Sequence, residues 1–376
     1  MLNFSMSQGK NINRYKYIVY IFIVCHVFVN STFSKICIIL DTFLDVNLNL
    51  PLGTNLMTVA LSTFFGALGK FLGIFLSGHK QHILIWTFFL NAICLLFCAF
   101  PKYVSVFIFF RTLQGFIAGL QNSTLFGLMG TLPECRNAFT NFTTISSFLS
   151  IMVIVILYFT NPKNIIIALV FINLFSWIFF WSVLTISDSK TQLKEIDWLT
   201  VKILATNKMF ILKSVFLGSF LGFTLLAISQ QKSIIINVFG SKFYQLSNIL
   251  SSITFLASGI TSFFSFAHTQ RLFNLLTFAC VWCIFIGIAT KSLFLFLIGA
   301  FLPFSCFSII NPIIMQDLTL YSSNKFMSAS CANGLRSFVT ALVILIIPRL
   351  FNSVFEVSIF CIFALSLFYG FLSSKN

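Results

Sequence analysis

A single long uncharged stretch constrains this chain more than any other feature. Residues 103–129 form a 27-residue run in which Arg111 is the one charged side chain. A run of that length spans the ~30 Å apolar core of a bilayer as one α-helix. Because a helix rises about 1.5 Å per residue, Arg111 would lie roughly 12 Å from residue 103, well inside that core. A guanidinium at this depth is expected to face a polar cavity or a partner and not lipid.

Helical spacing gives this stretch a polar face. At about 100° per residue, the polar side chains after Arg111 fall within roughly a third of the circumference. Two glycines border the face as a Gly-x-x-x-Gly pair, which allows close approach of a neighbouring helix. The predicted cavity residues of this helix are Arg111, Gln114, Gln121 and Asn122, and the predicted packing residues are Gly115 and Gly119.

Composition extends the membrane assignment to the whole chain. Of 376 residues, 58% are hydrophobic and 8% are charged. Soluble domains carry about 25% charged residues, so the composition indicates a polytopic membrane protein. The net charge of +15 does not indicate nucleic-acid binding, because no basic stretch forms a compact soluble domain. The ten cysteines lie mostly in apolar runs and are expected to pack as small residues.

The order of apolar runs predicts an all-α membrane protein with twelve transmembrane helices in two six-helix bundles. One polar stretch divides the chain into two halves with similar numbers of apolar runs. This is the layout of a parallel repeat about an axis along the membrane normal. The expected parts are an N-terminal tail at 1–16, a first bundle at 17–186, a central loop at 187–209, a second bundle at 210–372 and a tail at 373–376.

Further polar and small residues recur at helical spacing in other runs. His26 and Asn30 form a polar stripe in the first run, where His26 is either hydrogen-bonded between helices or lines the cavity. Arg336 lies deep in the eleventh run and is a further cavity candidate. Lys70, near the cytoplasmic third of the second run, is expected to snorkel toward that interface. Close helix packing is predicted at Gly66, Gly69, Gly73, Gly218 and Gly222.

The distribution of basic residues predicts the orientation. Lysine and arginine are more numerous in the segments that share a side with both chain ends than on the other side. The positive-inside rule therefore predicts that both termini are cytoplasmic. The sequence does not distinguish the plasma membrane from an internal one.

Three segments resemble the major facilitator superfamily, in the order that this family has them. Residues 111–115 (RTLQG) resemble the motif of its fourth helix, most similar to the drug:proton antiporter branch. Residues 67–77 resemble the end of its second helix, and residues 131–136 the loop after the fourth. The loop after the second helix, with His79 and Lys80 as its gating residues, lacks the family's acidic residue. The fifth run lacks the Gly-Pro signature of drug antiporters.

The predicted function is secondary transport of a small solute by alternating access through a central cavity. The expected solute is anionic or polyhydroxylated, with Arg111 as its main anchor, and the other expected contacts are membrane lipids. No enzyme activity, cofactor, metal or nucleic acid is expected, and the chain is expected to be a monomer. The alternative is a transporter-like sensor or scaffold that no longer moves solute.

Overall fold

The computed structural model describes residues 20–26, 29–30, 54–76, 80–100, 103–160, 162–185, 198–240 and 282–350. In this part of the chain eight helices have 20 residues or more. The predicted eighth and twelfth spans, at 249–266 and 354–372, lie outside the described residues, as does His79.

The first half contributes five long helices and a short helical stretch at residues 20–26. The long helices are α3 (Thr54–Phe75), α4 (Lys80–Ala99), α5 (Val104–Thr131), α6 (Cys135–Phe159) and α7 (Pro162–Thr185).

The second half contributes three long helices, a surface helix and a short stretch at residues 282–289. The surface helix is α8 (Trp198–Thr206). The long helices are α9 (Lys208–Ile234), α12 (Leu293–Thr319) and α13 (Lys325–Ile346). A π-helical turn (Ile235–Phe239) continues α9, and a 3₁₀ turn (Ile347–Arg349) ends α13.

Length and composition suit these helices to a bilayer. Five stretches in the described part are long and apolar enough to cross one: His82–Ala99, Val104–Thr131, Lys163–Ser182, Lys208–Leu226 and Lys325–Arg349. The outer side of α7 carries exposed Phe171, Phe175 and Ile178 at helical spacing, as a lipid-facing surface would. The chain is therefore an integral, multi-pass membrane protein.

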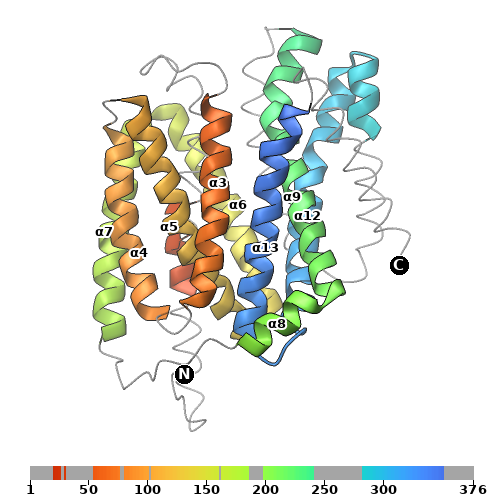
Figure 1. The fold of residues 1–376 in the computed structure, drawn as a ribbon. Helices are drawn as coiled ribbons and strands as arrows, with labels where there is room; N and C mark the ends of the chain where they lie inside the picture. The colour runs from red at the N-terminus through yellow and green to blue at the C-terminus, as the bar shows by residue number, and fades with distance from the viewer. Residues whose placement is uncertain are drawn as a thin grey trace.

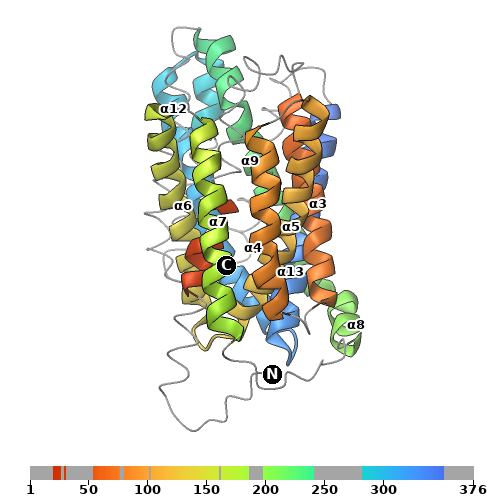
Figure 2. The same ribbon diagram turned by 90° about the vertical axis from the view of Figure 1, so that its left-hand side faces the viewer.

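The helices form two groups that stand side by side. Figure 1 shows α3 to α7 in one group and α9, α12 and α13 in the other, and Figure 2 shows the same helices from the side of α4 and α7. Within the first group α3 packs on α5, and α4 packs on α5 and α7. Within the second, α13 and α12 pack on α9 and on each other.

Contacts between the groups form a seam along α13. In this seam α13 packs against α3 and α5, and α12 packs against α6. At its lowest point, Gly127 and Gly130 of α5 lie against the Phe326 ring and the Ala329 methyl of α13. Higher up, the Phe338 ring of α13 lies 6.2 Å from the Phe71 ring of α3, centroid to centroid.

Helix α8 lies across the lower end of the seam, where a polar loop was expected at 187–209. It forms because Trp198, Val201 and Leu204 recur at helical spacing. Val201 packs against the cluster of Ile74, Phe326 and Met327, in which α3 and α13 meet. The Trp198 ring lies 5.6 Å from the Phe75 ring, centroid to centroid.

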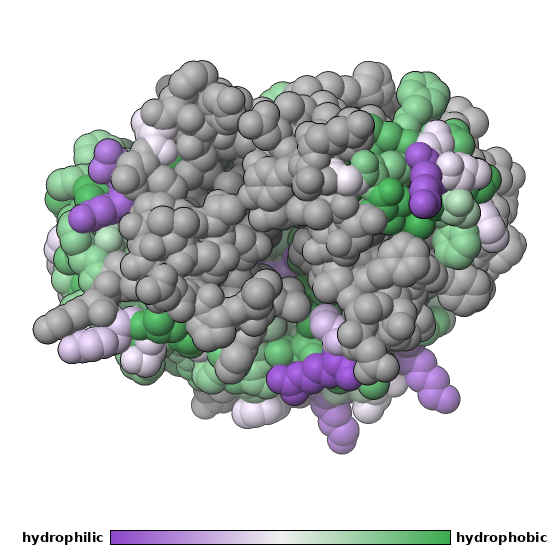
Figure 3. Space-filling view, turned by 90° about the horizontal axis from the view of Figure 1, so that it is seen from above, coloured by the Kyte–Doolittle hydropathy of each residue, from purple (hydrophilic) through white to green (hydrophobic). Residues whose placement is uncertain are grey.

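Figure 3 views the opposite end of the molecule and shows hydrophobic side chains of the described residues around its sides. At the α8 end, the two groups of helices are joined through Gly127, Gly130 and α8.

Candidate functional site

A buried polar network lies inside the first group of helices. Arg111, Gln114 and Gln121 project from one side of α5 and are 3%, 1% and 0% exposed. Their spacing of three and seven residues places them on one helical face, as the sequence indicates. The network runs from Arg111 toward the middle of the membrane, because Gln121 lies ten residues, or about 15 Å, further along α5.

The stretch at residues 20–30 is held against this face by an aromatic group. The Phe22 ring lies 5.3 Å from that of Phe88 in α4 and 4.9 Å from that of Phe180 in α7, centroid to centroid. One helical turn further on, His26 is 2% exposed. This packing orients His26 and Asn30 toward α5.

Gln121 and Asn30 connect the two segments. The Gln121 Oε1 atom lies 2.8 Å from His26 Nδ1 and accepts a hydrogen bond from Asn30 Nδ2 at 3.1 Å. Asn30 Nδ2 is also 3.1 Å from His26 Nδ1. His26 therefore donates to Gln121 when its Nδ1 carries a proton and accepts from Asn30 when it does not.

Asn30 is the junction of the network. Its Oδ1 atom accepts from Asn91 Nδ2 of α4 at 3.0 Å and from Gln114 Nε2 of α5 at 2.9 Å. Arg111 in turn donates to Gln114 Oε1. The hydrogen bonds therefore follow one direction, from the guanidinium through two amides to Gln121.

The sequence analysis did not predict Asn91 as a site residue, because it is a lone amide in one of the least polar runs. Lone residues give no periodic signal, so only the fold brings Asn91 to Asn30. Two atoms of the network, Asn91 Oδ1 and Gln121 Nε2, are buried and have no hydrogen-bond partner among the described residues. One is an acceptor and one is a donor, so the network can hold a further polar group.

Asn122 and Arg336 lie at the seam and not in this network. Asn122 Oδ1 accepts from Asn333 Nδ2 of α13 at 3.3 Å. Arg336 is 7% exposed and donates to Asn311 Oδ1 of α12 and, at 2.7 Å, to Asn333 Oδ1. Its guanidinium carbon lies 5.3 Å from the centroid of the Phe126 ring of α5.

The prediction that Lys70 snorkels toward the cytoplasmic interface is wrong. Its Nζ atom donates to Ser337 Oγ of α13, across the seam. The reason is its position on α3, about 160–200° around the helix from the exposed Leu68 and Leu72. The side chain therefore points between the two groups of helices. Ser337 carried no sequence signal for this contact.

The predicted packing glycines lie where backbones meet. Gly66, Gly69 and Gly73 of α3 face α5, where Gly115 and Gly119 face α3 in return. Gly218 and Gly222 of α9 face the Arg336 carbonyl and Val343 of α13. The Gly218 carbonyl also accepts from Thr340 Oγ1 at 2.9 Å. These contacts set the spacing of the helices that carry the polar residues.

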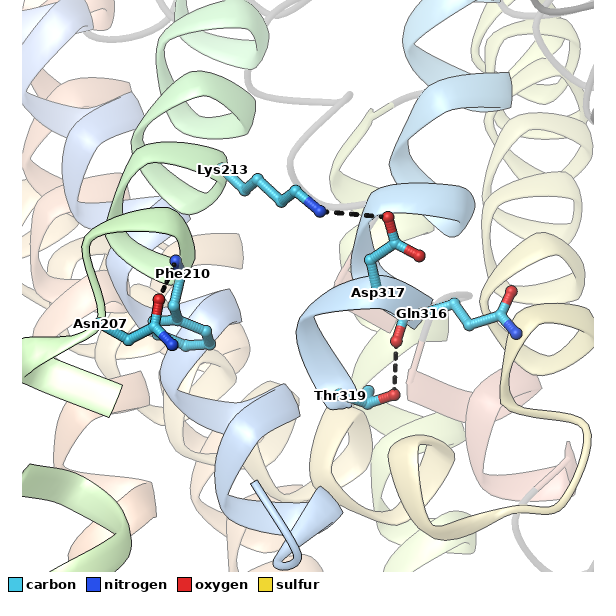
Figure 4. Close-up of polar contacts among 6 residues, drawn as sticks. All are labelled: Asn207, Phe210, Lys213, Gln316, Asp317 and Thr319. Carbon is cyan, nitrogen blue, oxygen red and sulfur yellow. Dashed lines mark hydrogen bonds and ion pairs between the residues drawn. The ribbon is translucent and has the colours of Figure 1, made fainter. Parts of the chain in front are cut away.

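The lower end of the second group has its own polar contacts. Figure 4 shows the ion pair of Lys213 on α9 with Asp317 on α12, 3.3 Å apart. It also shows Asn207 Oδ1, which caps α9 by accepting from the Phe210 amide at 3.1 Å. Both side chains of the ion pair are partly exposed, so the pair contributes about 0–1 kcal/mol to the free energy of unfolding.

The predicted gating residue Lys80 is described only by its backbone position. Lys80 is the first residue of α4, at the α8 end (Figure 1). No group of three or more His, Cys, Asp or Glu side chains in the described part of the chain is placed to hold a metal ion.

Comparisons with known proteins agree at the level of fold. No protein-family model and no curated protein matches this chain. Among solved structures, it is similar to the major facilitator superfamily proton:xylose symporter XylE with bound 6-bromo-6-deoxy-D-glucose. The TM-score is 0.69, with 96% of each chain covered and 11% sequence identity. The chain therefore has the fold of the major facilitator superfamily.

Proposed function

We propose that this chain is a secondary transporter that moves a small solute by alternating access between two six-helix bundles. The observation that carries the proposal is the seam between the two groups of helices. They meet through Gly127, Gly130 and α8 at the lower end and through single hydrogen bonds in the middle. A carrier of this kind closes one end of its path while the other is open, by rocking one bundle against the other.

The polar network supports a solute that carries hydroxyl groups. A hydroxyl both donates and accepts, so it matches the unpaired Gln121 Nε2 donor and Asn91 Oδ1 acceptor. The sugar derivative bound to XylE has such groups. Arg111 orients the network through Gln114, and the proposed solute-binding residues are Arg111, Gln114, Gln121, Asn122, His26, Asn30, Asn91 and Arg336.

The proposed orientation places the α8 end in the cytoplasm, with both termini on that side. Arg136, Lys202 and Lys208 lie at this end, as the positive-inside rule requires. The structure then corresponds to a state that is closed to the cytoplasm. The RTLQG motif at residues 111–115 favours the drug:proton antiporter branch.

Uptake by purified protein in proteoliposomes tests the proposal. We expect saturable uptake of one class in a screen of sugars, polyols, hydroxy acids and drugs run at pH 5.5 and pH 7.5. A rate that differs between the two values would assign proton coupling. Absence of flux for all classes, with binding retained, would favour the alternative of a sensor or scaffold.

An arginine variant tests the role of the network. Arg111→Gln should lower uptake at least about tenfold, because loss of a buried charged hydrogen bond costs about 1.5–3 kcal/mol. Arg349→Gln, at the opposite end of α13 from α8, is the matched control and should transport like the unchanged protein. Equal uptake by the two variants would remove Arg111 from the site.

A further inference from the structure

Two positive charges from opposite halves meet at the seam. Lys70 belongs to α3, and its ammonium donates to Ser337, the residue that follows Arg336 in α13. This contact places two basic side chains side by side, where like charges repel. Lys70 is also within electrostatic reach of His26, so the pair adjoins the polar network.

Neutral groups hold both charges. Lys70 donates to a hydroxyl, and Arg336 donates to the amide oxygens of Asn311 and Asn333. The Arg336 Nε atom is buried and donates to no atom in the described part of the chain. Guanidinium groups at such depth ordinarily pair with an anionic group.

The acidic residues in the described ranges lie away from the pair. They are Glu134, in the turn between α5 and α6, and Asp317, which pairs with Lys213. Both lie at the α8 end of the molecule, at the ends of helices. Neither carboxylate therefore compensates Lys70 and Arg336.

Lys70 is only half-buried although it points away from lipid, whereas Arg336 is 7% exposed. Below them, Phe326 and Met327 of α13 pack with Ile74 of α3 and with α8. These apolar side chains separate the pair from the α8 end, so an anion would approach Lys70 from the side away from α8.

We propose that Lys70 and Arg336 together bind an oxyanion, a carboxylate or phosphate group carried by the solute. The unpaired Arg336 Nε–H and the Lys70 ammonium supply charged donors from two sides, and such donors suit planar or tetrahedral oxyanions. The anion offsets the repulsion between the two halves, so its binding stabilises the closed seam. That the oxyanion belongs to a transported solute rests on the proposed function. That Lys70 and Arg336 bind an oxyanion does not.

Thermal unfolding of the full-length protein in detergent tests the site. Inorganic phosphate and succinate are titrated at constant ionic strength, with sodium chloride as the balancing salt and glucose as the neutral comparison. We expect a saturable rise in Tm with either oxyanion and none with glucose. Lys70→Gln and Arg336→Gln should each weaken the apparent affinity at least about tenfold, as expected for loss of a charged hydrogen bond.

Two further variants keep the test decisive. Lys70→Arg conserves the charge and should keep the rise in Tm, which covers the case in which a neutral variant does not fold. Lys163→Gln removes an exposed lysine at the start of α7 and should behave like the unchanged protein.

Each remaining result overturns the inference. These results are no rise with phosphate or succinate, a rise that survives both glutamine variants, or a rise that is lost in Lys163→Gln. Failure of the proposed function is separate: phosphate or succinate would then bind with the expected variant pattern while proteoliposomes show no flux. Flux without anion binding would contradict only the present inference.

Discussion

Asn30 shows how one short side chain can connect three helical segments. Its oxygen accepts from Asn91 and Gln114, and its nitrogen donates to Gln121. Through these three hydrogen bonds, Asn30 joins both α4 and α5 to the segment that carries His26. The geometry of the network therefore depends on this residue more than on any of its neighbours.

Replacing Asn30 by alanine should damage both folding and uptake. The change leaves the Asn91 and Gln114 amide nitrogens buried without their acceptor, which costs about 1–3 kcal/mol. We expect a lower Tm and a loss of uptake of at least about tenfold at equal protein amount. Proteoliposome uptake and thermal unfolding measure the two effects.

Asn173→Ala is the matched control. Asn173 is fully buried, whereas Asn30 is partly buried, and the Asn173 Nδ2 atom donates to the Leu169 carbonyl one turn earlier in α7. This variant should keep its uptake. A similar loss of uptake in both variants would mean that the effect comes from destabilised helices and not from the network.

Residues on one helix could be placed from the sequence, whereas their partners on other helices could not. Arg111, Gln114 and Gln121 share a face because helical periodicity fixes their relative directions. The contact of Lys70 with Ser337 joins residues 267 positions apart, and nothing local in either segment indicates it.

At the scale of elements, the packing of α3 on α5 determines where the polar face of α5 points. A β-carbon at Gly119 would lie 2.0 Å from the Gly66 carbonyl oxygen, and one at Gly115 would lie 2.3 Å from that of Ser62. Both obstacles are backbone atoms, which cannot move as a side chain would. The two helices can therefore approach this closely only with glycine at these positions.

Gly119→Ala should separate α3 from α5. Overpacking of this kind costs about 1–3 kcal/mol, and the free energy of unfolding in a detergent titration measures it. Gly334→Ala in α13 is the control, since its β-carbon would meet the Phe71 ring at an ordinary 3.4 Å. That variant should be neutral or more stable, because alanine favours helix over glycine. Equal destabilisation by both changes would contradict the close packing of α3 on α5.

Helix α8 closes the lower end of the seam, so a charge on its inner side should loosen that end. Val201→Asp places a carboxylate against Phe326 and Met327, where no partner compensates it. Cys331 packs beside this cluster and is partly buried. We expect faster alkylation of Cys331 by a water-soluble thiol reagent, followed by mass spectrometry. Lys202→Asp, on the exposed side of α8, should leave the rate unchanged, and equal rates in the two variants would exclude α8 as a seal.

Long apolar elements could be predicted from the sequence to within a few residues, but α8 could not. The run at 103–129 corresponds to α5 at Val104–Thr131, and the run at 293–315 to α12 at Leu293–Thr319. Helix α8 has nine residues within a polar stretch, and its apolar side is completed only by α3 and α13. Tertiary packing decides such short helices.

At the scale of the whole molecule, the two groups of helices are joined by few kinds of contact. Glycine and alanine meet at the lower end, amides and hydroxyls in the middle, and two cations lie between them. Apolar side chains complete the seam: the Phe71 ring meets that of Phe338, and Ile74 packs with Phe326 and Met327.

A cross-link between α6 and α12 tests the central claim that this seam must open for transport. The Cys135 Sγ atom lies 4.0 Å from Thr319 Oγ1, a separation at which a second thiol is within reach of a disulfide. Thr319→Cys would therefore allow oxidation to join the first half to the second at the closed end. A protease site placed between the halves reports the cross-linked fraction, and Thr319→Ser is the control.

Solute flux in proteoliposomes, measured on Thr319→Cys before oxidation, after oxidation and after reduction, is the deciding measurement. The account predicts that flux falls in proportion to the cross-linked fraction and returns when the disulfide is reduced, while Thr319→Ser is unaffected throughout. A fully cross-linked protein that moves solute at the rate of the reduced one would contradict it.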